Sequence, residues 1–127
     1  MADESKPLQG CKVLVVEDDY LVALAVAGVL EEAGASVIGP VGWADEALSL
    51  VESGREQVDA AILDVDLHGQ KSYAIADALV QRKIRFIFAT GYGEESVDPR
   101  YQRHSRCQKP FDERALLRAL APSAARS

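Results

Sequence analysis

Residues 11–19 read CKVLVVEDD, an uninterrupted run of β-branched and aliphatic side chains that ends in three acids. Apolar side chains at consecutive positions, rather than at alternate ones, are typical of a strand buried on both faces of a parallel sheet. Shorter runs of this kind follow at residues 37–38, 60–63 and 86–89, with a weaker one at 105–108. We therefore predict five buried strands, the first of them over residues 11–16.

Helical patterns fill the intervals, at residues 19–33, 43–53, 70–82 and 112–120. The alternation of strands and helices with short connections predicts an α/β, flavodoxin-like fold. We expect a five-stranded parallel sheet in the order 2-1-3-4-5, with helices on both faces. Residues 91–106 contain a proline and few apolar side chains, so we expect the fourth helix to be short, displaced or mobile.

The size and composition of the chain are those of one globular domain, with 127 residues of which 48% are hydrophobic and 27% charged. A net charge of −6 argues against a nucleic-acid partner, which would require a local excess of Lys and Arg. The longest apolar run, residues 21–30, is too short to cross a bilayer, and we find no secretory signal. We expect a single cytoplasmic domain over residues 1–127, with a core over about residues 10–121, frayed ends, no output domain and no membrane contact.

Polar residues follow four of the predicted strands. Glu17 and Asp18 follow the first strand, Asp64 ends the third, Thr90 ends the fourth and Lys109 follows the fifth. In open parallel sheets the carboxyl ends of the strands border the ligand crevice, so we expect these side chains to meet there. Clustered carboxylates resist joint ionisation unless a cation joins them, and Mg²⁺ prefers such oxygen ligands. A carboxylate can accept a phosphoryl group, whose oxygens an ammonium and a hydroxyl would stabilise.

Three neighbouring polar residues receive a simpler interpretation. Asp19 is expected to be the N-cap of the helix that follows it. His68 and His104 lie in predicted loops without a partner at metal-ligand spacing, and we interpret both as surface residues.

The motifs VLVVEDD, LDVDLHG, FATG and KPF resemble those of bacterial response-regulator receiver domains, in the family's order and at about its spacings. The resemblance extends over nearly the whole chain and implies a phosphorylation switch that requires Mg²⁺. By this resemblance Asp64 is the phosphoacceptor, and the metal is held by Glu17, Asp18, Asp64 and the backbone carbonyl of Asp66. The resemblance also implies that Thr90 is the switch hydroxyl and that Lys109 is the lysine at the phosphoryl group.

The same resemblance implies the partners. The phosphoryl group would come from a histidine kinase or a phosphotransfer protein, and a downstream protein would read the result. Transfer and slow hydrolysis would be self-catalysed, so we expect a switch rather than an enzyme. Residues 85–92, RFIFATGY, are similar to the signature of the FATGUY subfamily, typically stand-alone receivers that work with HWE-type kinases. Arg85 replaces the proline that often opens this signature.

Three features depart from the family pattern. The five residues after Asp64 contain none of the prolines that the family usually has there. Arg106 stands where an aromatic switch residue is usual, and the interval from Thr90 to Lys109 is short. Burying a guanidinium without a partner is costly, so an aromatic-type switch is not expected. We expect phosphorylation instead to order residues 91–106, with Gly91 and Tyr92 as the hinge and Tyr92 repacking.

Two other functions compete with this interpretation. The sequence Asp64-Val65-Asp66 after a strand also resembles the nucleophile motif of haloacid-dehalogenase-type phosphatases. Here, however, the acid pair Glu17-Asp18 precedes it, and no Asp-Asp pair follows Lys109. The second alternative is a degenerate receiver that binds a partner without phosphorylation, and the complete set of site residues argues against it.

Overall fold

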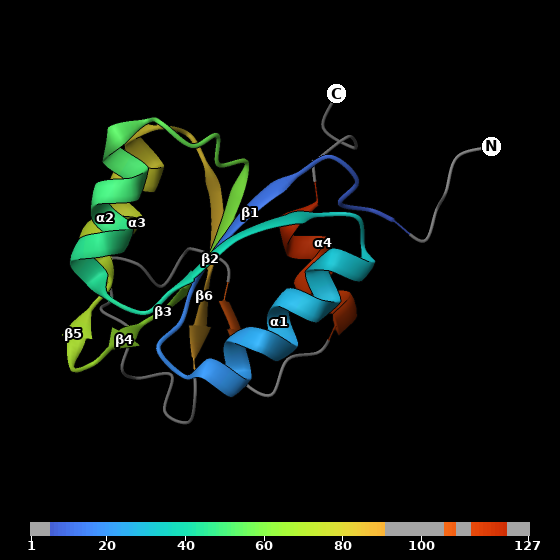
Figure 1. Cartoon of the computed structure of the whole chain (residues 1–127), viewed down its shortest axis with the longest axis horizontal. Helices are drawn as coiled ribbons and strands as arrows, with labels where there is room; N and C mark the ends of the chain where they lie inside the picture. Colours follow the sequence, from blue (N-terminus) through green and yellow to red (C-terminus); the bar gives the residue numbers. More distant parts are fainter. Residues whose placement is uncertain (1–5, 91–105, 109–112, 122–127) are drawn as a thin grey trace.

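The computed structural model describes residues 6–90, 106–108 and 113–121, and for residues 90 and 106–108 it describes the backbone alone. Five strands form one sheet in the order β2-β1-β3-β6-β7, and all neighbouring pairs are parallel (Figure 1). Counted along the chain, these five strands have the predicted order 2-1-3-4-5. Their bounds are β1 Lys12–Val16, β2 Ser36–Val41, β3 Ala60–Asp64, β6 Arg85–Thr90 and β7 Arg106–Gln108.

Helices cover both faces of this sheet, as predicted. Helices α1 (Tyr20–Glu32) and α4 (Glu113–Leu120) contribute to one buried cluster, and α2 (Ala44–Ser53) and α3 (Tyr73–Gln81) contribute to another. Figure 1 shows the two pairs of helices on opposite sides of the strands. None of the described helices is long and apolar enough to cross a membrane.

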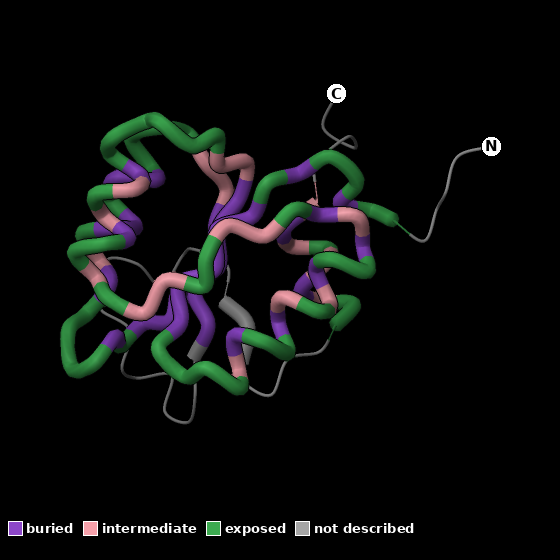
Figure 2. Tube along the Cα trace, viewed as in Figure 1, coloured by how far each residue is buried: buried purple, intermediate pink, exposed green. Residues whose placement is uncertain are grey.

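The central strands supply alternate side chains to the two clusters. In β3, Ile62 belongs to the cluster under α1 and α4, whereas Leu63 belongs to the cluster under α2 and α3. Successive side chains of a strand point to opposite faces, so a strand covered on both sides needs an apolar residue at every position. All five residues of β3 are buried, and Figure 2 shows burial concentrated in the central strands.

The ends of two helices follow from residues that the sequence singles out. Asp19 is the N-cap of α1, because its Oδ1 accepts the N–H groups of Leu21 at 3.0 Å and Val22 at 3.2 Å. Gly54, with φ +69°, ends α2 in the left-handed conformation that glycine adopts without strain. Asp19 is thus the predicted N-cap, and α2 ends at Ser53, the last residue of the helix predicted over residues 43–53.

The predicted start of the third helix at residue 70 is wrong. Strand β4 (Asp66–Leu67) pairs antiparallel with β5 (Gln70–Lys71), and α3 begins only at Tyr73. His68 and Gly69 connect the two strands with φ values of +50° and +86°. Positive φ at both positions of a two-residue connection matches the twist of a hairpin, so this turn displaces the first helical residues.

The N-terminal segment is ordered earlier than the prediction of a frayed stretch through residue 10. Leu8 is fully buried in the α1–α4 cluster, and its N–H donates to the Ala33 carbonyl at 2.9 Å. Burial of a leucine side chain contributes about 1.5–3 kcal/mol, which offsets part of the entropic cost of ordering this segment. The expected fourth helix, the hinge Gly91–Tyr92 and His104 lie outside the described residues.

Candidate functional site: a carboxylate cluster

Three carboxylates meet at the carboxyl ends of β1 and β3. These strands are hydrogen-bonded neighbours in which Val16 lies opposite Leu63, so Glu17 and Asp64 leave the sheet side by side. Glu17, Asp18 and Asp64 each offer one oxygen, and these three oxygens lie within 4.8 Å of one another. The structure thus brings together the three carboxylates that the sequence predicted to meet.

The cluster combines two buried carboxylates with one exposed carboxylate. Glu17 and Asp64 are buried, whereas Asp18 is exposed. The Oε2 atom of Glu17 accepts the Asp19 N–H at 3.0 Å, so the backbone at the start of α1 orients this side chain. Carboxylate oxygens are the hard ligands that Mg²⁺ prefers, and this cluster offers three of them. The side of the cluster at the exposed Asp18 would leave room for water and phosphate. The donor set therefore fits Mg²⁺.

Asp18 makes a contact that the sequence did not predict. Its Oδ2 accepts the backbone N–H of His68 at 2.9 Å, across fifty positions of sequence. Burial raises the pKa of Asp18, but the hydrogen bonds from the His68 N–H and with the Asp64 side chain outweigh it, and the pKa lies below its ordinary value. These contacts favour the charged form of the carboxyl, which is the form that binds a cation.

Asp66 lies two residues beyond Asp64, on the β4–β5 hairpin. Its N–H points to Asp64 Oδ1 at 3.4 Å, and its exposed carboxylate forms an ion pair with Lys71 at 3.0 Å. The side chain of Asp66 is not a member of the three-carboxylate cluster. The role of the Asp66 backbone carbonyl as a metal ligand stays a prediction.

Thr90 is the last residue of β6, next to the strand that ends in Asp64. Asp64 lies opposite Ala89, so the Thr90 backbone is one residue further toward the carboxyl end of the sheet. Its side chain is not among those described, and Lys109, Gly91 and Tyr92 lie outside the described residues. Lys109 directly follows Gln108, the last residue of β7.

Sequence reasoning missed the surroundings of His68. The side chain is exposed, as predicted, but its ring stacks on Trp43 with a centroid distance of 3.6 Å and an interplanar angle of 10°. Its Nδ1 lies 2.9 Å from the Gly42 carbonyl oxygen. The sequence feature that could have indicated this contact is the His68-Gly69 pair, which forms a hairpin turn. This turn brings His68 toward the end of β1.

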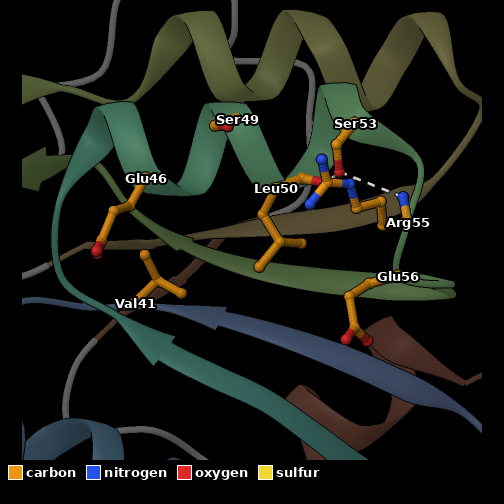
Figure 3. A pocket seen from close by; sticks show the side chains of 7 residues that line it. All are labelled: Val41, Glu46, Ser49, Leu50, Ser53, Arg55 and Glu56. Atoms are coloured by element: carbon orange, nitrogen blue, oxygen red, sulfur yellow. Dashed lines mark hydrogen bonds between the residues drawn. The ribbon is translucent and has the colours of Figure 1, made fainter.

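A surface cavity of about 490 Å³ lies elsewhere, between β2 and α2 (Figure 3). None of its lining residues is a predicted site residue, and the Arg55 N–H donates to Ser53 Oγ at 3.2 Å within it. The lining comprises Val41, Glu46, Ser49, Leu50, Ser53, Arg55 and Glu56. This cavity is therefore distinct from the carboxylate cluster.

Comparisons with known proteins identify a matching family and similar structures. The family model described as "Response regulator receiver domain" matches residues 13–121. The solution structure of SdrG from Sphingomonas melonis Fr1 is 41% identical, with a TM-score of 0.77 over 87% of this chain and 92% of that chain. A second solution structure, of the BeF3-activated conformation of SdrG from Pseudomonas melonis Fr1, is 42% identical, with a TM-score of 0.71 over 86% of this chain and 92% of that chain.

A more distant structure shows the same fold. The response regulator receiver protein from Sinorhizobium medicae WSM419 is 18% identical, with a TM-score of 0.75 over 89% of this chain and 93% of that chain. No curated protein matches the chain significantly.

Proposed function

The chain belongs to the response regulator receiver domain family, and from that premise we propose that it is a switch set by phosphorylation of Asp64. The observation that carries the proposal is the cluster of Glu17, Asp18 and Asp64 oxygens at the carboxyl ends of adjacent strands. In this proposal residues 1–127 form one receiver domain, and Mg²⁺ is held by the three carboxylates together with the Asp66 carbonyl.

The chemistry follows from the donor set. A carboxylate oxygen of Asp64 forms a bond to phosphorus, while the bond from phosphorus to the donor's leaving atom breaks and its electron pair leaves with the donor. When bound by Glu17, Asp18 and Asp64, Mg²⁺ would supply positive charge beside the carboxylates and the phosphoryl oxygens. Lys109 would pair with those oxygens, and the Thr90 hydroxyl would turn toward them once the phosphoryl group is attached. Asp18, held by the His68 N–H, stays charged and in place.

The proposed partners are proteins. A histidine kinase, of the HWE type if the FATGUY signature holds, or a phosphotransfer protein would donate the phosphoryl group. A downstream protein would bind the phosphorylated form, with Gly91 and Tyr92 as the hinge of the segment that changes. SdrG from Pseudomonas melonis Fr1 has a BeF3-activated conformation, which supports activation by a phosphoryl mimic here also. The net charge of −6 agrees with protein rather than nucleic-acid recognition in the cytoplasm.

The test is intact mass measurement after treatment with acetyl phosphate and Mg²⁺. We expect wild type to gain the mass of one phosphoryl group, and Asp64→Asn or wild type with excess chelator to gain none. Glu32→Gln, which removes an exposed carboxylate at the last residue of α1, is the charge-matched control and should label like wild type.

Each contrary result identifies a different error. Labelling of Asp64→Asn would show that the acceptor is another residue. Absence of labelling in wild type would favour the degenerate receiver. Rapid turnover of a small phosphoester would favour the haloacid-dehalogenase-type phosphatase.

A further inference from the structure

His68 adopts a backbone conformation that residues other than glycine take uncommonly. Its φ of +50° places it in the left-handed region, where most side chains are disfavoured by about 1 kcal/mol or more. Such a conformation persists only when surrounding contacts determine it. The turn of the β4–β5 hairpin favours the left-handed conformation of His68, and side-chain contacts stabilise it further.

Three contacts from two other segments hold His68 in place. The backbone N–H donates to Asp18 Oδ2 at the end of β1. The imidazole Nδ1 lies 2.9 Å from the Gly42 carbonyl oxygen, which accepts its hydrogen in the Nδ1–H tautomer. The ring stacks on Trp43, the residue that precedes α2.

The Trp43 side chain is itself unusual in its position. It is 52% exposed, which makes it one of few large apolar side chains of the described residues that remain in water. As the N-cap residue of α2 it forms no side-chain capping hydrogen bond. Its described ring contact is the stack on His68, so its position is explained by that stack and not by the core or by the helix.

We infer that His68 and Trp43 are positioning residues for Asp18: the stack holds the hairpin turn so that the His68 N–H fixes the carboxylate for Mg²⁺. This inference rests on the proposed function, since it concerns the same site. Neither side chain would touch the ion or the reacting atoms. Partners that orient a metal ligand typically change metal affinity by 10–100-fold when removed, because the free carboxylate must then be ordered on binding.

The chain offers its own optical probe, because Trp43 is the only tryptophan. Titration of Mg²⁺ should produce a saturable change in Trp43 fluorescence, because the stack is linked through His68 to Asp18. The same dissociation constant should describe the shift of the Asp18 amide resonance in ¹H–¹⁵N spectra. Asp18→Asn should abolish both responses.

The variants separate positioning from general stability. His68→Ala and Trp43→Ala should each weaken Mg²⁺ binding about tenfold by the amide resonances, and the double variant should weaken it no further. His68→Asn tolerates the left-handed turn and keeps a side-chain donor, and Trp43→Phe keeps a stacking ring, so both should recover part of the affinity. Val80→Ala, which shortens an exposed apolar side chain of α3, is the matched control and should bind Mg²⁺ like wild type.

Each outcome is decisive. Wild-type-like Mg²⁺ affinity in the folded alanine variants, or additive losses in the double variant, would overturn the inference and leave the proposed function intact. A wild type that saturates with Mg²⁺ by its amide resonances without any change in Trp43 fluorescence would also overturn it, and this result requires no variant to fold. A wild type that binds no Mg²⁺ would overturn the proposed function itself.

Discussion

Asp59, the residue before β3, is hydrogen-bonded to Lys12, the first residue of β1. Its N–H donates to the Lys12 carbonyl at 2.8 Å, and its Oδ2 accepts the Lys12 N–H at 2.8 Å. Its Oδ1 accepts a hydrogen bond from Gln57 Nε2 at 3.0 Å. The Gln57 side chain and then the Lys12 N–H lower the pKa of Asp59 below its ordinary value.

This lowered pKa predicts a pH dependence of stability. A carboxyl whose pKa is lower in the folded state contributes stability above its unfolded pKa and loses it as the pH falls through the folded value. Asp59→Asn has the shape of the protonated side chain, so it should lower the free energy of unfolding by at most about 1 kcal/mol at neutral pH, given solvent screening. Urea unfolding should show this difference shrinking below about pH 4. The charge-removing control is Glu32→Gln at the exposed end of α1, and a constant difference for Asp59→Asn at every pH would contradict the prediction.

At the residue scale, the sequence predicted the acidic site and missed what supports it. Glu17, Asp18 and Asp64 could be placed because parallel strands bring their carboxyl ends to one edge, whatever the details of the loops. The contact of His68 with Asp18 depends on two positive φ angles and on a ring stack between separate loops. Composition and periodicity carry no information about such angles, so this part of the site could not be predicted from the sequence.

Two arginines hold the C-terminal ends of two helices on opposite faces of the sheet. Arg85 Nε and Nη2 donate to the Leu120 carbonyl oxygen at the end of α4, at 3.2 and 2.9 Å. Arg82 Nη2 donates to the Glu52 carbonyl oxygen near the end of α2 at 2.6 Å. The last carbonyls of a helix have no partner within it, and a cation near them also complements the helix dipole.

Removal of either guanidinium should therefore loosen one helix and spare the other. Arg85→Ala should lower the free energy of unfolding by about 1 kcal/mol and increase hydrogen exchange in α4. Arg82→Ala should do the same for α2, and each variant is the matched control of the other. Equal effects on both helices, or none on either, would show that these contacts do not hold the helix ends.

At the element scale, the predicted helices and strands were recovered where burial decides them, and the errors lie at the ends. The sheet order and the helices after β1, β2 and β3 followed from apolar runs and periodicity. The predicted start of α3 was wrong because residues 70–71 pair with β4, and the His68–Gly69 turn allows this pairing. Leu8 was missed because a single apolar residue in a polar segment shows no period.

The sheet order of the whole molecule decides the state of its two cysteines. Cys11 directly precedes β1, is buried and is free, and Cys107 lies in β7. Two strands, β3 and β6, separate β1 from β7. Three steps of about 4.8 Å amount to roughly 14 Å, well beyond the ~7 Å between Cα atoms that a disulfide can span.

We therefore expect two free thiols in the protein. A thiol titration of the unfolded, non-reduced protein should find both, and the same titration after reduction is the control. A recovery of none would contradict the strand order, because it would require the two cysteines to be neighbours.

The alternation of β3 side chains between the two buried clusters has a consequence for how this sequence can drift over generations. Ile62 and Leu63 are neighbours in the chain, yet the sheet separates them into different packing environments. A change in the volume of Ile62 is compensated most directly by residues of its own cluster, such as Leu116, far away in the sequence. Substitutions in one buried cluster can therefore accumulate nearly independently of substitutions in the other. The edge of the sheet where β1 and β3 end constrains both clusters, because the positions of Glu17 and Asp64 depend on the packing of both.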